Sequence, residues 1–213
     1  MEQKLFTRIF HQTEPSLSDR FRILTEGAKY DVSCSSSGSD RQGCFAGGIC
    51  HTFTPDGRCV SLLKILMSND CRYQCRYCPN RKDLDIPRAT LSPTELCEIT
   101  DSFYRRNYIE GLFLSSAVFN TPDITMERML QAVILLRKVY RFQGYIHMKA
   151  IPGCDPLLIR RAAEYADRMS VNTELPSRAG LQRLAPQKKP EHLAAPMTQL
   201  AQIWRERKET GQR

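Results

Sequence analysis

The sequence predicts an α/β fold in which about four parallel strands, each followed by a helix, form part of a TIM-type βα barrel. From about residue 60 onward, short apolar runs alternate with amphipathic helical stretches, a pattern typical of βα units. The third and fourth apolar runs also alternate polar with apolar residues, whereas a parallel strand covered on both faces is almost continuously apolar. A curved sheet around a polar chamber explains this better than an open sheet, because unpaired polar groups in a dry core are costly.

Local patterns place the elements of this fold in order. The strands are expected at residues 60–67, 111–117, 144–151 and 168–175. The helices are expected at residues 18–30, 92–107, 125–141, from 155 onward and 196–209. Ser92 and Glu95 form a capping box with a proline at the first helical position, and Asp155 precedes another such proline as an N-cap. Apolar side chains recur at three- and four-residue steps in the third of these helices, so one of its faces should be buried.

The first 59 residues differ in composition from the rest of the chain. After the first helix comes a Ser/Gly-rich stretch, and Gly- and Cys-rich sequence typical of loops continues to residue 59. We therefore divide the chain into a loop-rich N-terminal extension, 1–59, and a core, 60–213. Four cysteines of the extension offer ligands for a second metal centre, either an auxiliary iron-sulfur cluster or zinc: Cys34, Cys44, Cys50 and Cys59.

The most informative motif follows directly after the first core strand. Cys71, Cys75 and Cys78 form the pattern Cys-x3-Cys-x2-Cys. Three thiolates at this spacing can bind one 4Fe-4S cluster, and a cluster with three protein ligands keeps one iron open for a substrate or cofactor. The alternative, a structural zinc site, needs a fourth ligand, for which Cys59 and His51 are the candidates.

A strand that ends in this motif, with the aromatic residue Tyr77 before the last cysteine, resembles the radical S-adenosylmethionine (SAM) superfamily. The resemblance implies a 4Fe-4S cluster on Cys71, Cys75 and Cys78 and SAM on the free iron. Electron transfer from an external donor, such as a flavodoxin or ferredoxin, then cleaves SAM to a 5′-deoxyadenosyl radical. The aromatic position before the third cysteine usually lies beside the adenine, which assigns that place to Tyr77.

The same resemblance suggests other SAM contacts. Where the superfamily often has Gly-Gly-Glu after the second strand, this chain has Ser115 and Ser116, which keep the backbone contact with the methionyl amino group and omit the acidic residue. Asn172 and Glu174 stand at the fourth strand, where polar residues commonly meet the ribose or carboxylate. The alternative for all four is that they are polar residues satisfied inside a barrel.

His147 and Lys149 belong to the polar face of the third strand, so they should point into the same chamber. There they can orient the substrate or move protons. The competing interpretation of His147 is a hydrogen-bonded histidine of the barrel interior with no catalytic part.

Longer runs resemble one branch of the superfamily, described as DNA modification or repair radical SAM proteins. The matching runs are residues 29–38, 48–64, 106–116, 144–149 and 167–176. The branch implies a nucleic acid as substrate and a uracil-DNA glycosylase-like protein as partner. Superfamily cores have six strands, and this branch continues into a DNA-binding region, whereas the sequence stops after its fourth βα unit. We therefore expect a truncated form, or a partner that supplies the missing strands.

Composition limits the class of protein. A chain of 213 residues with 41% hydrophobic and 25% charged residues is typical of an ordinary globular protein. No signal peptide and no run approaching eighteen apolar residues is present, so we expect a cytoplasmic protein without a membrane span. Nine cysteines in such a protein indicate metal binding or catalysis rather than disulfides.

The net charge of +8 is concentrated near the end of the chain. Residues 176–213 carry eight Lys or Arg against three Asp or Glu, whereas residues 1–60 carry seven of each. A basic tail can follow a nucleic-acid backbone, although a solvated helix with charged faces explains the same residues. The alternatives to an enzyme are thus a metal-stabilised nucleic-acid-binding module and an inactive fragment of the enzyme.

Overall fold

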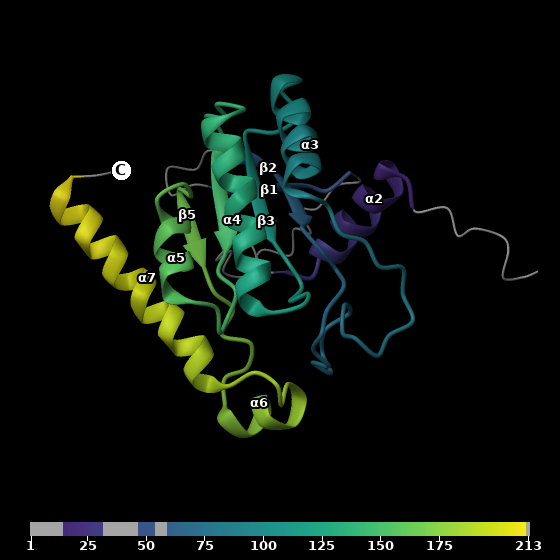
Figure 1. Cartoon of the computed structure of the whole chain (residues 1–213), viewed down its shortest axis with the longest axis vertical. Helices are drawn as coiled ribbons and strands as arrows, with labels where there is room; N and C mark the ends of the chain where they lie inside the picture. The colour runs from purple at the N-terminus through teal and green to yellow at the C-terminus, as the bar shows by residue number, and fades with distance from the viewer. Residues whose placement is uncertain (1–14, 32–46, 54–58, 212–213) are drawn as a thin grey trace, which may run out of the picture.

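The computed structural model describes residues 15–31, 47–53 and 59–211. Its centre is a five-stranded sheet in the order β1-β2-β3-β4-β5. The strands are β1 (Ile49–Phe53), β2 (Cys59–Leu66), β3 (Gly111–Ser115), β4 (Tyr145–Lys149) and β5 (Arg168–Ser170). Strands β2 to β5 are parallel neighbours in chain order, which confirms the predicted α/β fold with four parallel βα units (Figure 1).

Six helices are described, and four of them were predicted close to their bounds. They are α2 (Leu17–Ala28), α3 (Pro93–Arg105), α4 (Pro122–Lys138), α5 (Pro156–Ala163), α6 (Arg178–Leu184) and α7 (Pro190–Thr210). The capping box of α3 is present, because the Ser92 side chain accepts from the Glu95 N–H and the Glu95 carboxylate accepts from the Ser92 N–H. The Asp155 side chain caps α5 as expected, accepting from the N–H of Leu157. None of the described helices is long and apolar enough to cross a membrane.

Two predictions for single strands are wrong. Residues 49–53, expected as loop, form β1, which pairs antiparallel with β2. The local sequence is rich in Gly and Cys, which does not indicate a strand. Residues 49–53 form a strand because their backbone pairs with that of β2. The fourth parallel strand ends at Ser170 and does not reach residue 175. The chain leaves the ladder there, and Glu174 adopts a left-handed backbone with a φ of 64°.

The C-terminal part also differs from the expectation. The last helix begins six residues earlier than predicted, at Pro190, and contains Pro196 in its interior. Either proline can occupy the first turn of a helix, so the pattern alone did not separate them. The short helix α6 was not predicted, since seven residues give too little periodicity to recognise.

Alternation along the parallel strands separates an apolar outer face from a polar inner face. Leu112 and Leu114 on β3 and Ile146 and Met148 on β4 are completely buried. Helices α3, α4 and α5 cover this face in Figure 1. The residues between them, Phe113, Ser115, His147 and Lys149, point to the opposite side. The predicted polar face is therefore present, and it is buried as well.

Helix α2 closes the sheet at the edge formed by β1 and β2. At its start, Arg20 forms a bidentate ion pair with Glu95 of α3, with N–O distances of 2.6 and 3.0 Å. At its end, the carbonyl oxygens of Lys29 and Asp31 accept hydrogen bonds from the ammonium of Lys64 on β2. A cation at the C-terminus of a helix compensates the partial negative charge of the free carbonyl groups. These contacts bring Asp31 to the inner face of the sheet.

We expect Glu95→Gln to lower the free energy of unfolding by about 1 kcal/mol at pH 7, because it weakens both the capping box and the pair with Arg20. Arg20 holds the pKa of the Glu95 carboxyl at about 2, below its usual value of 4.5. The contribution is therefore complete above about pH 4.5 and is lost as the pH falls towards 2. Urea unfolding at pH 7 and pH 3 measures it.

Glu98→Gln is the matched control, since Glu98 is exposed on the same helix. Its effect should stay within about 0.5 kcal/mol. Equal effects of the two substitutions would show that Glu95 does not link α2 to α3.

Candidate functional site

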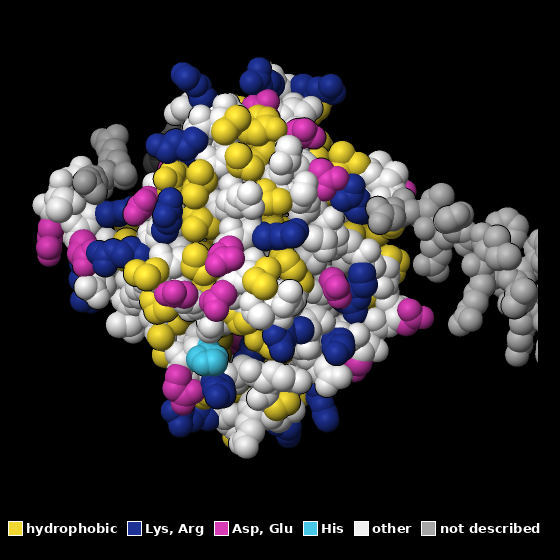
Figure 2. All heavy atoms as spheres, in the orientation of Figure 1, with side chains coloured by type: hydrophobic (Ala, Val, Ile, Leu, Met, Phe, Trp, Pro, Cys, Tyr) yellow, Lys and Arg dark blue, Asp and Glu magenta, His cyan; other side chains and the backbone are white. Residues whose placement is uncertain are grey.

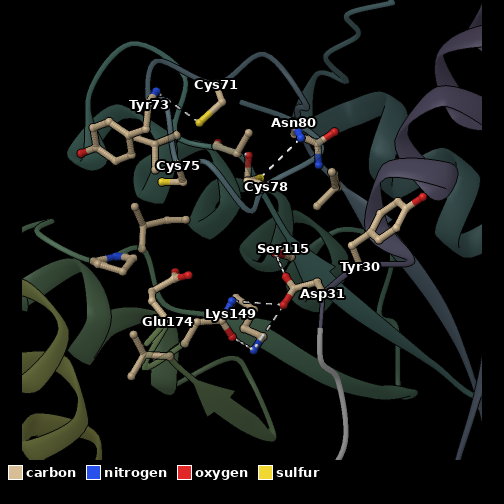
Figure 3. Close-up of a pocket in the computed structure, with 18 of the residues that line it drawn as sticks. Tyr30, Asp31, Cys71, Tyr73, Cys75, Cys78, Asn80, Ser115, Lys149 and Glu174 are labelled. Carbon is tan, nitrogen blue, oxygen red and sulfur yellow. Dashed lines mark hydrogen bonds and ion pairs between the residues drawn. The ribbon is translucent and has the colours of Figure 1, made fainter. Parts of the chain in front are cut away.

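A cavity of about 740 Å³ lies at the carboxyl ends of the parallel strands. This volume is within the usual range for small-molecule and cofactor sites, which parallel sheets place at this edge. All ten residues predicted for the site line the cavity: Cys71, Cys75, Tyr77, Cys78, Ser115, Ser116, His147, Lys149, Asn172 and Glu174. They come from four separate segments of the chain. In Figure 3 the three cysteines lie across the space from Lys149 and Glu174.

The three cysteines stand on the loop that follows β2. Cys75 is buried, and Cys71 and Cys78 are partly exposed. Backbone N–H groups of Tyr73 and Asn80 donate to the sulfur atoms of Cys71 and Cys78, each at 3.4 Å. Such bonds stabilise thiolates and are among the features by which proteins adjust iron-sulfur clusters.

Arg88 fixes the shape of this loop, and sequence reasoning did not find it. Its guanidinium donates to four backbone carbonyl groups at 2.6 to 2.9 Å, which belong to Asn69, Asn80, Arg81 and Leu84. One side chain thus joins the start of the loop to the segment after the third cysteine. The role depends on backbone groups, so no residue pattern indicates it.

Helix α6 and its neighbours cover the cysteine loop from the C-terminal side. Cys75 packs in a small apolar cluster with Leu181, Ala185 and Leu193, separate from the main core. The N–H of Arg76 donates to the carbonyl of Leu184 at 2.8 Å. Burial raises the pKa of the Cys75 thiol, and the nearby Lys188 ammonium opposes the rise.

The donor set suits an iron-sulfur cluster by its chemistry. Three free cysteines on one loop line a single cavity, two of them with N–H donors on their sulfur atoms. In the described part of the chain, no three Cys, His, Asp or Glu side chains are gathered closely enough to hold a single metal ion. The three cysteines line the same cavity, so rotation of their side chains is the motion that would gather the thiols around one cluster.

The two residues considered as the fourth ligand of a zinc site do not lie near the cysteine loop. These residues, Cys59 and His51, lie together, with 3.4 Å between Sγ and Nδ1. Cys59 is the first residue of β2, and the cysteine loop begins only after the last. Eight residues of strand place the two groups about 20 Å apart, too far for one tetrahedral site.

Two of the four cysteines predicted to hold a second metal centre lie within the described residues. Cys34 and Cys44 lie outside the described residues. Cys50 is buried on β1, and Cys59 is exposed and in contact with His51. Since Cys50 and His51 are consecutive in a strand, their side chains point to opposite faces, which separates Cys50 from Cys59.

Tyr77, Glu174 and Lys188 form one network at the mouth of the cavity. The Tyr77 hydroxyl donates to Glu174 at 2.6 Å, and the Lys188 ammonium donates to the other carboxylate oxygen. The side chains of Lys188 and Glu174 are 16% and 8% exposed, so the pair is well shielded. The left-handed backbone of Glu174 is of the kind that tends to occur at functional sites. Lys188, which was not predicted, is thus part of the site.

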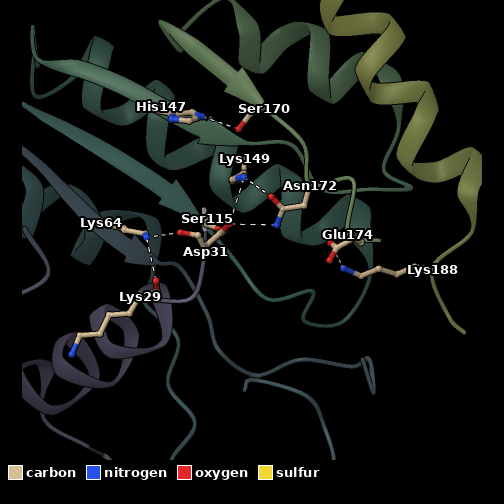
Figure 4. A network of polar contacts seen from close by, with 10 residues as sticks. All are labelled: Lys29, Asp31, Lys64, Ser115, His147, Lys149, Ser170, Asn172, Glu174 and Lys188. Atoms are coloured by element: carbon tan, nitrogen blue, oxygen red, sulfur yellow. Dashed lines mark hydrogen bonds and ion pairs between the residues drawn. The ribbon is translucent and has the colours of Figure 1, made fainter. Parts of the chain in front are cut away.

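Asp31 is the most important residue that the prediction missed. Its carboxylate accepts from the Ser115 hydroxyl and from the Asn172 amide at 3.3 Å, and lies 3.5 Å from the Lys149 ammonium. The three partners come from the ends of β3, β4 and the segment after β5 (Figure 4). No local residue pattern indicates this role, because the three partners are distant from Asp31 in the sequence.

His147 and Lys149 point into the cavity, as the alternation predicted. The Nε2 atom of His147 lies 2.8 Å from the Ser170 hydroxyl, and the Lys149 ammonium donates to the Asn172 side chain at 2.5 Å. Burial, together with the nearby charges of Arg168 and Lys149, lowers the pKa of His147 to about 3. The imidazole is therefore neutral at pH 7, with one N–H donor and one acceptor.

This burial predicts a pH-dependent stability. In the unfolded chain His147 binds a proton near pH 6.5, and in the folded chain only near pH 3, so stability falls as the pH drops between these values. From pH 7 to pH 4.5, His147→Gln should lose about 2 kcal/mol less stability than the unaltered chain. Urea unfolding across this range measures the difference, with the exposed His192→Gln as the control. Parallel pH profiles for all three proteins would contradict a neutral, buried His147.

Solved structures of other proteins share the fold of this chain. Methylornithine synthase (PylB) superposes on 65% of this chain with a TM-score of 0.56 and 16% sequence identity. HydG, a maturase of the [FeFe]-hydrogenase, superposes on 65% with a TM-score of 0.54 and 13% identity. The fold is a partial βα barrel. The matched part covers 40% of the first protein and 32% of the second, so the chain corresponds to a portion of each. No family model and no curated protein sequence matches the chain.

Proposed function

We propose that this chain is a radical SAM enzyme that holds a 4Fe-4S cluster on Cys71, Cys75 and Cys78. The observation that carries the proposal is the convergence of the ten predicted residues on one cavity at the carboxyl ends of the strands. The two structural neighbours are radical SAM enzymes, which supports the same chemistry for this fold. When bound, the cluster would supply the electron that cleaves SAM reductively.

Different residues of the cavity would bind different parts of SAM. Glu174, held by Tyr77 and Lys188, presents a fixed carboxylate to the ribose hydroxyls or the methionyl ammonium. Ser115 and Asn172, both held by Asp31, offer a hydroxyl and an amide to the polar groups of the methionyl part. Ser116 follows β3 at the cavity wall, where its backbone faces the ligand. Tyr77 is 43% exposed, so its ring is available to the adenine.

His147 and Lys149 would serve the substrate. The neutral imidazole can take up a proton only when an approaching negative charge raises its pKa, so at neutral pH its first role is to orient a polar group. The Lys149 ammonium, with one amide and one carboxylate in reach, can bind an acceptor atom of the substrate.

We also propose a nucleic acid or nucleotide as the substrate class and a flavodoxin or ferredoxin as the electron donor. Five runs of sequence resemble DNA modification radical SAM proteins, for which a uracil-DNA glycosylase-like protein is a candidate partner. The basic surplus of residues 176–213 offers weaker support. On the face in Figure 2, basic side chains are interspersed with acidic ones, as expected for a solvated surface. Binding of a single-stranded oligonucleotide that is lost steeply with salt would support this substrate.

Anaerobic reconstitution with iron and sulfide tests the proposed chemistry. The chain should bind about four irons with three cysteine ligands. Addition of SAM should change the electron paramagnetic resonance spectrum of the reduced cluster, since the ligand reaches the open iron. Uptake of zinc in place of iron, or a spectrum that SAM leaves unchanged, would favour the metal-stabilised binding module.

A further inference from the structure

The inner face of the sheet carries a row of basic residues one layer below the proposed SAM contacts. Lys64 of β2 is in register with Phe113 of β3, which is in register with His147 of β4, and His147 is in register with Arg168 of β5. The row contains two permanent cations, one imidazole and one aromatic ring. It contains no acidic residue.

The positive charge of Lys64 is stabilised by contacts within the fold. Its ammonium is bound by two carbonyl groups at the end of α2 and lies 5.7 Å from the centre of the Phe113 ring. It is 5% exposed and does not line the cavity. Its positive charge is stabilised but not neutralised, so it adds to the positive potential of the row.

Arg168 differs from Lys64, because it lines the cavity and its charge is not bound by other groups of the described part of the chain. Among the described residues, its guanidinium has no hydrogen-bond or ion-pair partner, although it lies close enough to His147 to depress that pKa. The cavity lining carries four cations, Arg81, Lys149, Arg168 and Lys188, against two carboxylates, Asp31 and Glu174. Since Lys188 is paired with Glu174 and Lys149 with Asp31, the uncompensated charge at the inner end is that of Arg168.

We infer that the inner end of the cavity, between Arg168, His147 and Lys149, binds an oxyanion of the substrate, a phosphate or a carboxylate. The guanidinium offers a planar pair of N–H donors that fits either group. His147 and Ser170 share one hydrogen bond, and the group that accepts in it keeps its own hydrogen as a further donor beside the guanidinium. Lys149 stands two residues after His147 on β4, and its ammonium contacts Asn172 and Asp31.

The subsite rests on the proposed function, because it would bind the substrate of that enzyme. The position of the oxyanion follows from the strand register. Arg168 and His147 stand two residues before Ser170 and Lys149 along their strands, which is about 7 Å further from the cysteine loop. The oxyanion would thus hold one end of the substrate while the reacting part extends towards the cluster and SAM.

Titration of the full chain with inorganic phosphate, and separately with acetate, tests this subsite. Isothermal calorimetry at constant ionic strength, with chloride as the balancing ion, gives the dissociation constants. The unaltered chain should bind one of the two anions saturably, and Arg168→Gln should weaken this binding at least tenfold. Tighter binding of phosphate identifies a phosphate subsite, and tighter binding of acetate identifies a carboxylate subsite.

Arg161→Gln is the control, because Arg161 is equally exposed and lies on α5 outside the cavity. It should change the binding less than twofold. No saturable binding, or equal binding by both variants, would overturn the inference. The titration does not depend on SAM cleavage, so a chain that binds the anion but leaves SAM intact contradicts only the proposed function, and the reverse result contradicts only the subsite.

Discussion

Cys75→Ser should abolish iron-sulfur loading of the chain after anaerobic reconstitution. Serine keeps the size of the side chain but is a poor ligand for iron, and a cluster that loses one of three protein ligands is not retained. We expect iron to fall from about four per chain to below about 0.5, and the absorbance near 400 nm to disappear. Iron and acid-labile sulfide assays measure both.

Cys59→Ser is the matched control for this experiment. Cys59 is exposed at the far end of β2, about 20 Å from the cysteine loop, and its replacement should leave iron loading unchanged. Loss of loading in the control, or full loading in Cys75→Ser, would contradict the assignment of the three cysteines. Circular dichroism of both variants shows whether a loss reflects unfolding.

Asp31→Asn should lower the free energy of unfolding by about 3 kcal/mol, because it removes the carboxylate partner of a buried lysine. The Lys149 side chain is only 8% exposed, and Asp31 is its one carboxylate partner in the described part of the chain. Asparagine keeps only one of the two acceptor oxygens, so either Ser115 or Asn172 loses its acceptor as well, and the affinity for SAM should fall at least tenfold. Urea unfolding and equilibrium binding of SAM measure the two effects.

The double variant Asp31→Asn with Lys149→Met separates charge pairing from general damage. Removing the unpaired ammonium should recover at least about 1 kcal/mol of the stability lost in Asp31→Asn. Asp83→Asn removes an exposed carboxylate, 53% accessible, from its pair with Arg81, and should change stability by less than about 0.5 kcal/mol. If Asp31→Asn is no more damaging than Asp83→Asn, Asp31 does not organise the site.

The features that local sequence determines were predictable. Alternation along residues 145–149 gave the polar inner face, and the capping box at Ser92 gave the start of α3, because both depend on neighbours within a few residues. The spacing of the three cysteines is likewise local. Their position after a strand placed them at the edge where the cavity lies.

The features that depend on distant contacts were not predictable. Asp31 reaches partners 84, 118 and 141 residues away, and no local pattern connects them. Arg88 binds carbonyl groups, which every residue has, and β1 exists through its pairing with β2. The residues predicted for the site therefore line one cavity, whereas Asp31 and Arg88, which hold parts of that cavity in place, were missed.

Formation of 5′-deoxyadenosine is the most direct test of the proposed chemistry. The reconstituted full chain should release it from SAM in the presence of dithionite, and omission of either the cluster or the reductant should stop its release. Liquid chromatography with mass spectrometry quantifies the product, and Cys75→Ser should give only background. A fully loaded chain that forms no 5′-deoxyadenosine above this background would contradict the account.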